Sequence, residues 1–224
     1  MVIQAILFDL DDTLYPEREF ALGGYRAVAQ TVADLGECEY ETAFDCMRTA
    51  FYESGRKAVF PCLLARFPGL SLTLKDMVRV YREHIPEIRL FPGYRPLLEE
   101  LRKKYLLGII TDGLPAVQRG KVGALGIEGL FEKIVYSWDY GEQRQKPHLY
   151  PFMLMLEALG IPPQSALFVG DNPEKDGRGA RGAGMRYVRV APSADSLPAP
   201  SLPDEIIVEN LLQLPQILIQ LQRV

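Results

Sequence analysis

The sequence predicts an α/β protein in which a doubly wound parallel sheet is interrupted, after its first strand, by an inserted helical domain. The first observation is the apolar run Val2–Phe8, which is broken only by Gln4 and leads directly into aspartates. Such a run, bounded by polar residues, is typical of a fully buried strand at the centre of a parallel sheet. The second observation is that short apolar runs alternate with helical patterns after residue 92, as they do in consecutive βαβ units.

Residues 15–91 show helical periodicity and no convincing strand; Val28 and Val32, for example, share one helical face. An ordinary βαβ unit takes only about 30 residues, so this segment is too long to be a single crossover. We expect it to be a helical cap domain of about four short helices, separated by glycines and prolines. The core domain would then consist of residues 1–14 and 92–224.

The rest of the core is expected to follow a regular order. Helices are predicted at residues 94–104, 115–125, 151–159 and 175–183, and after Asn210, which can cap the last one. Strands are predicted at residues 105–111, 133–137, 166–169 and 186–190, with 206–208 as a candidate edge strand. Residues 192–203 are rich in proline and are predicted to form a loop. Because crossovers are right-handed, the carboxyl ends of the parallel strands reach the same edge of the sheet.

The composition argues against several functional classes. Of the 224 residues, 48% are hydrophobic and 24% are charged, which is ordinary for a globular protein with a sizeable core. The net charge is −4, and the scattered Lys and Arg residues offer no basic surface for nucleic acid or an anionic membrane. No stretch is long enough to span a bilayer, and the N-terminal apolar run lacks the basic lead of a signal peptide.

The three cysteines, Cys38, Cys46 and Cys62, fit neither a disulfide framework nor a zinc site in their number and spacing. Reduced thiols in the cytosol account for them more simply. We therefore expect a cytoplasmic protein, monomeric or homodimeric, that binds neither nucleic acid nor membranes.

Polar side chains stand at the carboxyl ends of three predicted strands, and a lysine lies in the loop before the helix that leads to the fourth strand. These residues are Asp9, Asp11, Thr111, Asp112, Asp171, Asn172 and Lys146. Taken singly, an acidic turn or a loop lysine is more often a solvated surface feature. Ligands of open α/β sheets bind at this edge, however, and crowded carboxylates need a cation or a proton between them. Such a set of oxygens suits Mg²⁺ beside a phosphate.

The order of these residues resembles the haloacid dehalogenase-like (HAD) hydrolase superfamily, whose four motifs lie along a Rossmann-like core. FDLDDT (8–13) matches the first motif, ITDG (110–113) the second, QKP (145–147) the third and VGDNPEKDGRGARGAGM (169–185) the fourth. The resemblance covers the whole chain, including a helical cap between the first two motifs. The loop before Lys146 is slightly longer than in the commoner pattern of the family. Asp11 indicates the phosphatase branch, because the dehalogenases resemble Asp-x-Tyr at this point.

The resemblance implies a role for each motif residue. Asp9 would be the nucleophile that forms an aspartyl-phosphate. Asp11 would be the general acid and then the general base, a role for which we expect a raised pKa. Mg²⁺ would be held by Asp9, by the backbone carbonyl of Asp11 and by Asp171.

The remaining motif residues would bind the phosphoryl group or support the metal site. Thr111, Asp112 and Lys146 are expected to bind the phosphoryl oxygens, with Lys146 also offsetting charge in the transition state. Asn172 and Asp176 are expected to support the metal ligands from behind, Asp176 through Lys146 or bound water.

The implied function is a Mg²⁺-dependent phosphatase acting on a small phosphorylated metabolite, such as a sugar phosphate or a nucleoside monophosphate. A phosphomutase of the same fold is the alternative within the family, although the cap shows no clear basic cluster for a second phosphate. A non-enzymatic phosphoacceptor or binding module is the alternative outside it. For any one residue of the insertion, a solvated or core role is the simpler expectation. Candidate specificity residues among them are Tyr15, Arg18, Phe20, Tyr25, Arg56 and Lys57.

Overall fold

The computed structural model describes residues 2–190 and 202–222. The chain divides into two compact units, one formed by residues up to Pro16 together with those from Arg89 onward, and the other by Glu17–Ile88. Most of the loop predicted at residues 192–203 lies outside the described residues.

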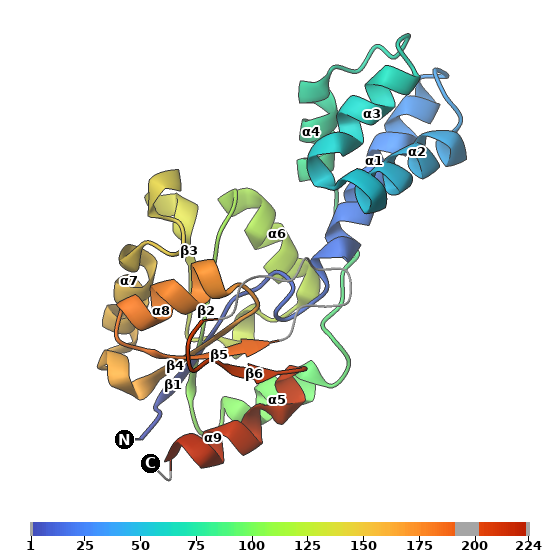
Figure 1. Cartoon of the computed structure of the whole chain (residues 1–224). Helices are drawn as coiled ribbons and strands as arrows, with labels where there is room; N and C mark the ends of the chain where they lie inside the picture. The colour runs from blue at the N-terminus through green and yellow to red at the C-terminus, as the bar shows by residue number, and fades with distance from the viewer. Residues whose placement is uncertain (1, 191–201, 223–224) are drawn as a thin grey trace. The chain divides into compact units, whose positions relative to one another are not determined.

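Within the described residues, the first unit contains a sheet of six parallel strands in the order β3-β2-β1-β4-β5-β6 (Figure 1). Their bounds are β1 Ala5–Phe8, β2 Leu106–Thr111, β3 Lys133–Tyr136, β4 Ala166–Gly170, β5 Arg186–Val190 and β6 Ile206–Val208. The chain winds outward from β1 to β3 and then from β4 to β6, so the direction of winding reverses between β1 and β4. The predicted doubly wound sheet is confirmed, and 206–208 is its edge strand.

Helices cover both faces of this sheet. Their bounds are α5 Tyr94–Leu101, α6 Pro115–Leu125, α7 Leu149–Leu159, α8 Arg178–Gly182 and α9 Leu214–Gln222. Helices α7 and α8 lie on one face, and α5 and α9 lie on the other (Figure 1). The central strands β1 and β4 are buried along their whole length, which explains why their sequences are continuously apolar.

The glycines of α8 allow this helix to pack closely. A Cβ atom added to Gly179 would lie 2.3 Å from the ring of Phe152 on α7, a distance that no real side chain tolerates. Gly179 therefore lets α8 approach α7, as expected for a packing role rather than a ligand-binding one.

The second unit is helical. Residues 17–88, all of which are described, form four α-helices: α1 Glu17–Asp34, α2 Tyr40–Ser54, α3 Val59–Arg66 and α4 Leu74–Glu83. Its core includes Val28, Val32, Met47, Leu63 and Met77, all fully buried.

Two side chains suggested as substrate contacts belong to the interior of this unit. Phe20 and Tyr25 are buried, and their rings pack edge-on or tilted against Tyr81 on α4. Tyr25 also contacts Phe60. Of the two roles considered for them, the structure supports the core role and not substrate contact, because their rings complete the core of a small helical bundle.

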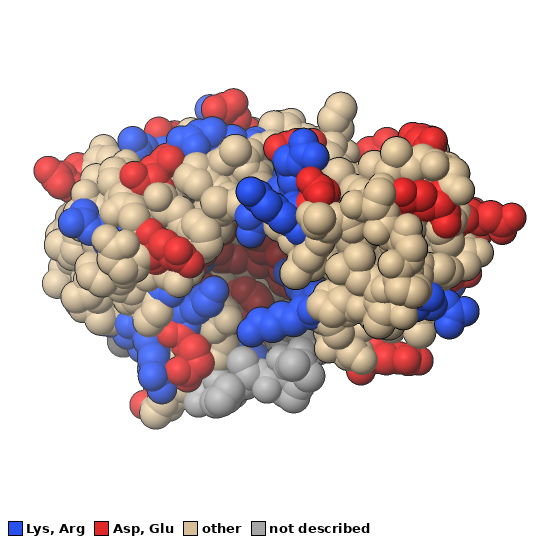
Figure 2. Space-filling model, turned by 90° about the horizontal axis from the view of Figure 1, so that it is seen from above, with Lys and Arg blue, Asp and Glu red and all other residues tan. Residues whose placement is uncertain are grey.

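Three further observations concern the features that were considered from composition. On the face shown in Figure 2, Lys and Arg side chains are interspersed with Asp and Glu. No described helix combines the length and the apolar character needed to cross a bilayer. Cys38, Cys46 and Cys62 are free thiols.

Candidate active site

The point where the sheet reverses its winding brings two aspartates together. Asp9 directly follows β1, Asp171 directly follows β4, and these strands are parallel neighbours with Phe8 paired to Val169. The Asp9 backbone N–H donates to the Val169 carbonyl at 2.9 Å, so the pairing continues to the last residue before the turn. In open α/β sheets this crevice is where ligands bind.

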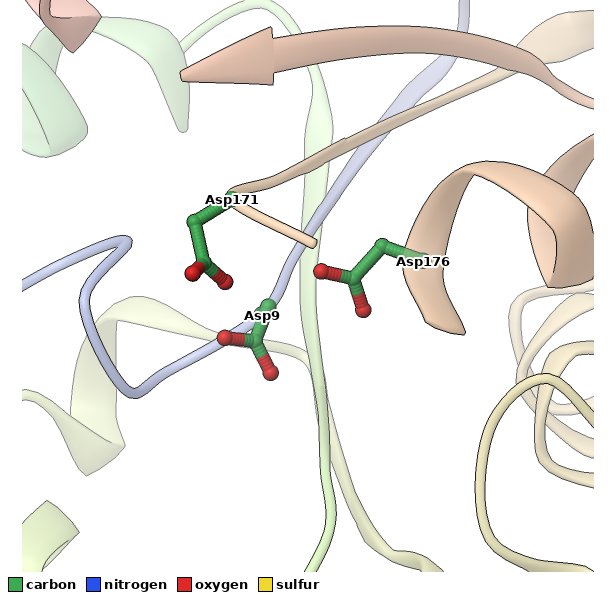
Figure 3. A group of neighbouring side chains, drawn as sticks. All are labelled: Asp9, Asp171 and Asp176. Atoms are coloured by element: carbon green, nitrogen blue, oxygen red, sulfur yellow. The ribbon is translucent and has the colours of Figure 1, made fainter. Parts of the chain in front are cut away.

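A third carboxylate completes the group. One carboxylate oxygen from each of Asp9, Asp171 and Asp176 lies within 4.8 Å of the others, and the three side chains point toward one another (Figure 3). Asp176 belongs to a helical turn, Pro173–Gly177, that follows β4. A Cβ atom on Gly170 would lie 2.3 Å from Asp176 Oδ2, so the absence of a side chain at Gly170 leaves room for this carboxylate.

Lys146 lies among these carboxylates and is only 3% exposed. Its ammonium donates to Asp9 Oδ1 at 2.5 Å and to the Ile110 carbonyl at 3.1 Å, and it pairs with Asp176 Oδ1 at 2.7 Å. The loop that precedes Lys146 contains a short helical turn, Glu142–Arg144. The structure therefore brings Asp9, Asp171, Asp176 and Lys146 to one point.

Burial and an excess of negative charge both shift the pKa values of the aspartates in this group. Burial, together with the charges of Asp176 and Asp11, raises the pKa of Asp9 to about 8, although Lys146 opposes the rise. Burial and the charges of Asp9 and Asp176 raise the pKa of Asp171 to about 9. For Lys146, burial alone would lower the pKa, but Asp176 and Asp9 outweigh it and raise the pKa well above its ordinary value.

This donor set suits a divalent metal ion. Asp9 and Asp171 offer hard carboxylate oxygens with Asp176 close to both, and the excess negative charge of the three is what Mg²⁺ would balance in place of protons. The Asp11 carboxylate is not in the group. A metal contact from the Asp11 backbone carbonyl stays a prediction.

Asp112, expected to bind phosphate, uses its side chain differently. Its Oδ1 atom accepts from Ser137 Oγ at 2.6 Å and from the Lys146 backbone N–H at 3.1 Å. A carboxylate repels an anionic phosphoryl group, whereas these two bonds fix the loop that carries Lys146. The side chain therefore supports Lys146, and only its backbone N–H is suited to phosphate.

Asn172 caps the turn that carries Asp176. Its Oδ1 atom accepts from the backbone N–H groups of Glu174 and Lys175 at 3.0 and 3.1 Å, and its own N–H donates to Asp176 Oδ2 at 3.1 Å. Asn172 thus orients Asp176 through its backbone N–H.

Asp11 is held by three donors. Its Oδ1 atom accepts from Tyr15 Oη at 2.5 Å and from Lys121 Nζ at 2.6 Å, and its Oδ2 atom accepts from Gln118 Nε2 at 2.8 Å. Burial alone would raise the pKa of Asp11, but the Lys121 charge and these hydrogen bonds bring it below its ordinary value. The expected raised pKa is wrong, because donors from α6 and Tyr15 stabilise the ionised form.

Gln118 and Lys121 were not among the residues singled out from the sequence. Gln118 also donates to Thr111 Oγ1, at 2.5 Å, so one amide contacts two of the predicted site residues. A signal was present: both side chains lie on the same buried face of α6 as Val122 and Leu125. Polar residues on the core-facing stripe of a helix next to the site are candidates for such a role.

Comparisons with known proteins show the family to which the chain belongs. Residues 6–190 match the family model described as haloacid dehalogenase-like hydrolase. The chain is 32% identical over 200 residues to a glyceraldehyde 3-phosphate phosphatase of Methanopyrus kandleri, covering 84% of each protein.

Two solved structures are similar over nearly their whole length. A HAD phosphatase from Thermococcus onnurineus is 25% identical with a TM-score of 0.64, covering 96% of this chain and 98% of that one. A 2-haloacid dehalogenase from Pseudomonas syringae pv. Tomato is 27% identical with a TM-score of 0.67, covering 98% and 99%. The chain belongs to the haloacid dehalogenase-like hydrolase family and to its phosphatase branch, whose members hydrolyse phosphoric monoesters.

Proposed function

We propose that this protein is a Mg²⁺-dependent phosphatase that hydrolyses a small phosphorylated metabolite through an aspartyl-phosphate on Asp9. The observation that carries the proposal is the position of Asp9. Its carboxylate lies beside Asp171, Asp176 and Lys146 at the edge of the sheet where ligands bind.

In the proposed first step, a carboxylate oxygen of Asp9 attacks the phosphorus, and the bond from phosphorus to the substrate's ester oxygen breaks. Asp11 gives a proton to the departing oxygen, which leaves as an alcohol. In the second step, Asp11 takes a proton from water, the water oxygen attacks the phosphorus, and the bond to Asp9 breaks to release inorganic phosphate.

The surrounding side chains would bind the transferred group. Lys146 and the hydroxyl of Thr111 would donate to phosphoryl oxygens, and Asp112 would contribute its backbone N–H. Asp9, the Asp11 carbonyl and Asp171 would hold Mg²⁺, with Asp176 behind them. When bound, Mg²⁺ supplies positive charge that lets two anions, the nucleophile and the phosphate, approach each other.

The environment of Asp11 fits the second step directly. Three donors favour its ionised form, which is the form that accepts a proton from water. For the first step the carboxyl must carry a proton, so one of these donors has to give way when the substrate binds.

The substrate would be a small phosphorylated metabolite, since the similar protein from Methanopyrus kandleri is named for a triose phosphate. We propose that the helical unit is the cap domain, with boundaries near residues 15 and 91, and that it sets the choice of substrate. Arg18, Arg56 and Lys57 are its proposed contacts. A cytoplasmic location and a monomeric or homodimeric state belong to the same proposal.

The test is to measure phosphate release from a panel of phosphorylated metabolites with Mg²⁺ and with EDTA. We expect Mg²⁺-dependent turnover that is abolished in Asp9→Asn, while circular dichroism shows that the variant stays folded. Interconversion of isomers without phosphate release would identify a phosphomutase instead. Phosphorylation that stops at one phosphate per chain would identify a phosphoacceptor, and halide release from a 2-haloacid would identify a dehalogenase.

A further inference from the structure

We propose that Gln118 is a positioning residue whose side-chain amide sets the direction of the Thr111 hydroxyl and the place of the Asp11 carboxylate at the same time. The inference rests on the proposed function, in which Thr111 binds the phosphoryl group and Asp11 transfers the proton. It assigns to α6 a part in the reaction that none of the four sequence motifs carries.

The geometry leaves little freedom to this amide. Gln118 is 2% exposed, and its Nε2 atom lies 2.8 Å from Asp11 Oδ2 and 2.5 Å from Thr111 Oγ1. A buried amide is costly unless its polar atoms are hydrogen-bonded, and here both N–H groups have acceptors. An ionised carboxylate can only accept, so it is the nitrogen of Gln118, not the oxygen, that faces Asp11.

This orientation decides what Thr111 can do. An amide nitrogen donates and does not accept, so Thr111 Oγ1 must accept from Gln118. The single proton of the hydroxyl then remains for another acceptor. Thr111 is completely buried at the carboxyl end of β2, where the proposed phosphoryl group would lie. Gln118 therefore keeps Thr111 a donor toward phosphate.

The same amide holds Asp11 at a different carboxylate oxygen from its other partners. Tyr15 and Lys121 occupy Oδ1, and Gln118 occupies Oδ2. Loss of Gln118 would leave Oδ2 without this donor and release the carboxylate from its link to Thr111. Proton transfer and phosphate binding should therefore weaken together when this one side chain is changed.

The first variants are Gln118→Met and Gln118→Glu. Gln118→Met keeps the length of the side chain and removes its hydrogen-bond donors, and Gln118→Glu replaces the donors by an acceptor. We expect kcat/KM for an alkyl phosphate such as glycerol phosphate to fall about tenfold to a hundredfold in Gln118→Met, and at least as far in Gln118→Glu. The Ki of inorganic phosphate should rise in both. The control is Arg119→Met, the neighbouring exposed residue of α6, which pairs with Asp139 and should change neither quantity.

Two comparisons separate positioning from a general structural effect. The link to Thr111 is tested with 4-nitrophenyl phosphate, whose leaving group needs little protonation. On this substrate, we expect the double variant Gln118→Met/Thr111→Val to have a kcat/KM no lower than that of the more impaired single variant. The link to Asp11 is tested by the leaving group: Gln118→Met, like Asp11→Asn, should lose more kcat/KM on glycerol phosphate than on 4-nitrophenyl phosphate.

The outcomes distinguish the two levels of the proposal. If Thr111→Val and Asp11→Asn themselves leave kcat/KM unchanged, the proposed roles of those residues fail. If both are impaired but Gln118→Met and Gln118→Glu behave as wild type, the inference about Gln118 is overturned. The inference would also be overturned by two results together: the kcat/KM losses of Gln118→Met and Thr111→Val multiply in the double variant, and Gln118→Met loses the same factor on glycerol phosphate and on 4-nitrophenyl phosphate. Such results would indicate a structural role for Gln118.

Discussion

Lys146 and Asp176 form a buried ion pair, with Nζ 2.7 Å from Oδ1, that joins the loop before α7 to the turn after β4. Both side chains are almost wholly inaccessible to solvent. Asp9 contacts the same ammonium, so a change in this pair would also affect the proposed nucleophile. A lone buried charge is costly, so each partner depends on the other.

Lys146→Met should therefore damage both activity and folding. Removal of the ammonium leaves Asp176 and Asp9 buried without their cation, and we expect the free energy of unfolding to fall by roughly 3 kcal/mol. The kcat/KM should fall by about a hundredfold or more, since a charge that would contact the phosphoryl group is lost. Urea unfolding and phosphate release measure the two effects.

The matched control is Lys175→Met. Its side chain is 48% exposed, and its ammonium lies 3.8 Å from Asp112 Oδ2, so both quantities should stay near the wild-type values. Equal losses in the two variants would contradict the special position of Lys146.

Gly170→Ala should displace Asp176. The new Cβ atom would lie 2.3 Å from Oδ2 and 2.6 Å from Cγ of Asp176, so the carboxylate or the strand end must shift. We expect a lower melting temperature and a higher Mg²⁺ concentration for half-maximal activity. The control is Gly120→Ala on α6, where a Cβ atom meets no other atom within 4 Å and where alanine favours the helix. A Gly170→Ala variant with wild-type Mg²⁺ dependence would show that Asp176 does not support the metal site.

Much of the site was predictable because it follows from local patterns. The apolar run ending at Phe8 predicted β1, and parallel winding then implied that Asp9 and Asp171 would meet at one edge. Lys146 could be selected by its order in the chain, although its precise partners could not. These inferences needed only strand positions and the handedness of the crossovers.

What could not be predicted depends on packing between distant residues. Gln118 and Lys121 reach Asp11 from more than one hundred residues away, and no local pattern states which carboxylate a buried helix face will meet. The pKa of Asp11 was expected to be raised because the sequence shows a neighbouring carboxylate. The donors from α6 that lower this pKa cannot be recognised in the sequence. The interior places of Phe20 and Tyr25 depend in the same way on how α1 packs.

The stability of the metal-free protein should fall as the pH rises. The pKa values of Asp9 and Asp171, about 8 and about 9 in the folded protein, lie above their ordinary value of 3.8. At pH values between the ordinary pKa and the raised pKa, these carboxyl groups keep their protons in the folded chain and have lost them in the unfolded chain. Each rise in pH in this range therefore favours unfolding. Thermal unfolding in EDTA should show a melting temperature that decreases from about pH 4 toward pH 9 through this contribution.

Mg²⁺ should reverse this trend. Binding requires ionised carboxylates, so the ion displaces protons and its affinity increases with pH. The rise in melting temperature on adding Mg²⁺ should be larger at pH 9 than at pH 6. In Asp171→Asn, the rise in melting temperature on adding Mg²⁺ should be small at both pH values. A shift in the wild-type protein that does not change with pH would contradict the assignment of raised pKa values to the metal ligands.

Lys121→Met should destabilise the protein in a way that depends on pH with the opposite sign. The pKa of Asp11 is lowered in the folded protein by Lys121 and the hydrogen bonds that overcome burial, so its ionised form stabilises the fold. This contribution is fully present above the ordinary pKa of about 4 and is lost as the pH falls through the lower, folded value. At pH 7 we expect Lys121→Met to cost about 1–3 kcal/mol of unfolding free energy, measured with urea, because a charged hydrogen bond is removed. The difference from wild type should shrink as the pH approaches 4 and below, whereas a variant that merely disturbs the packing of α6 would show the same difference at every pH.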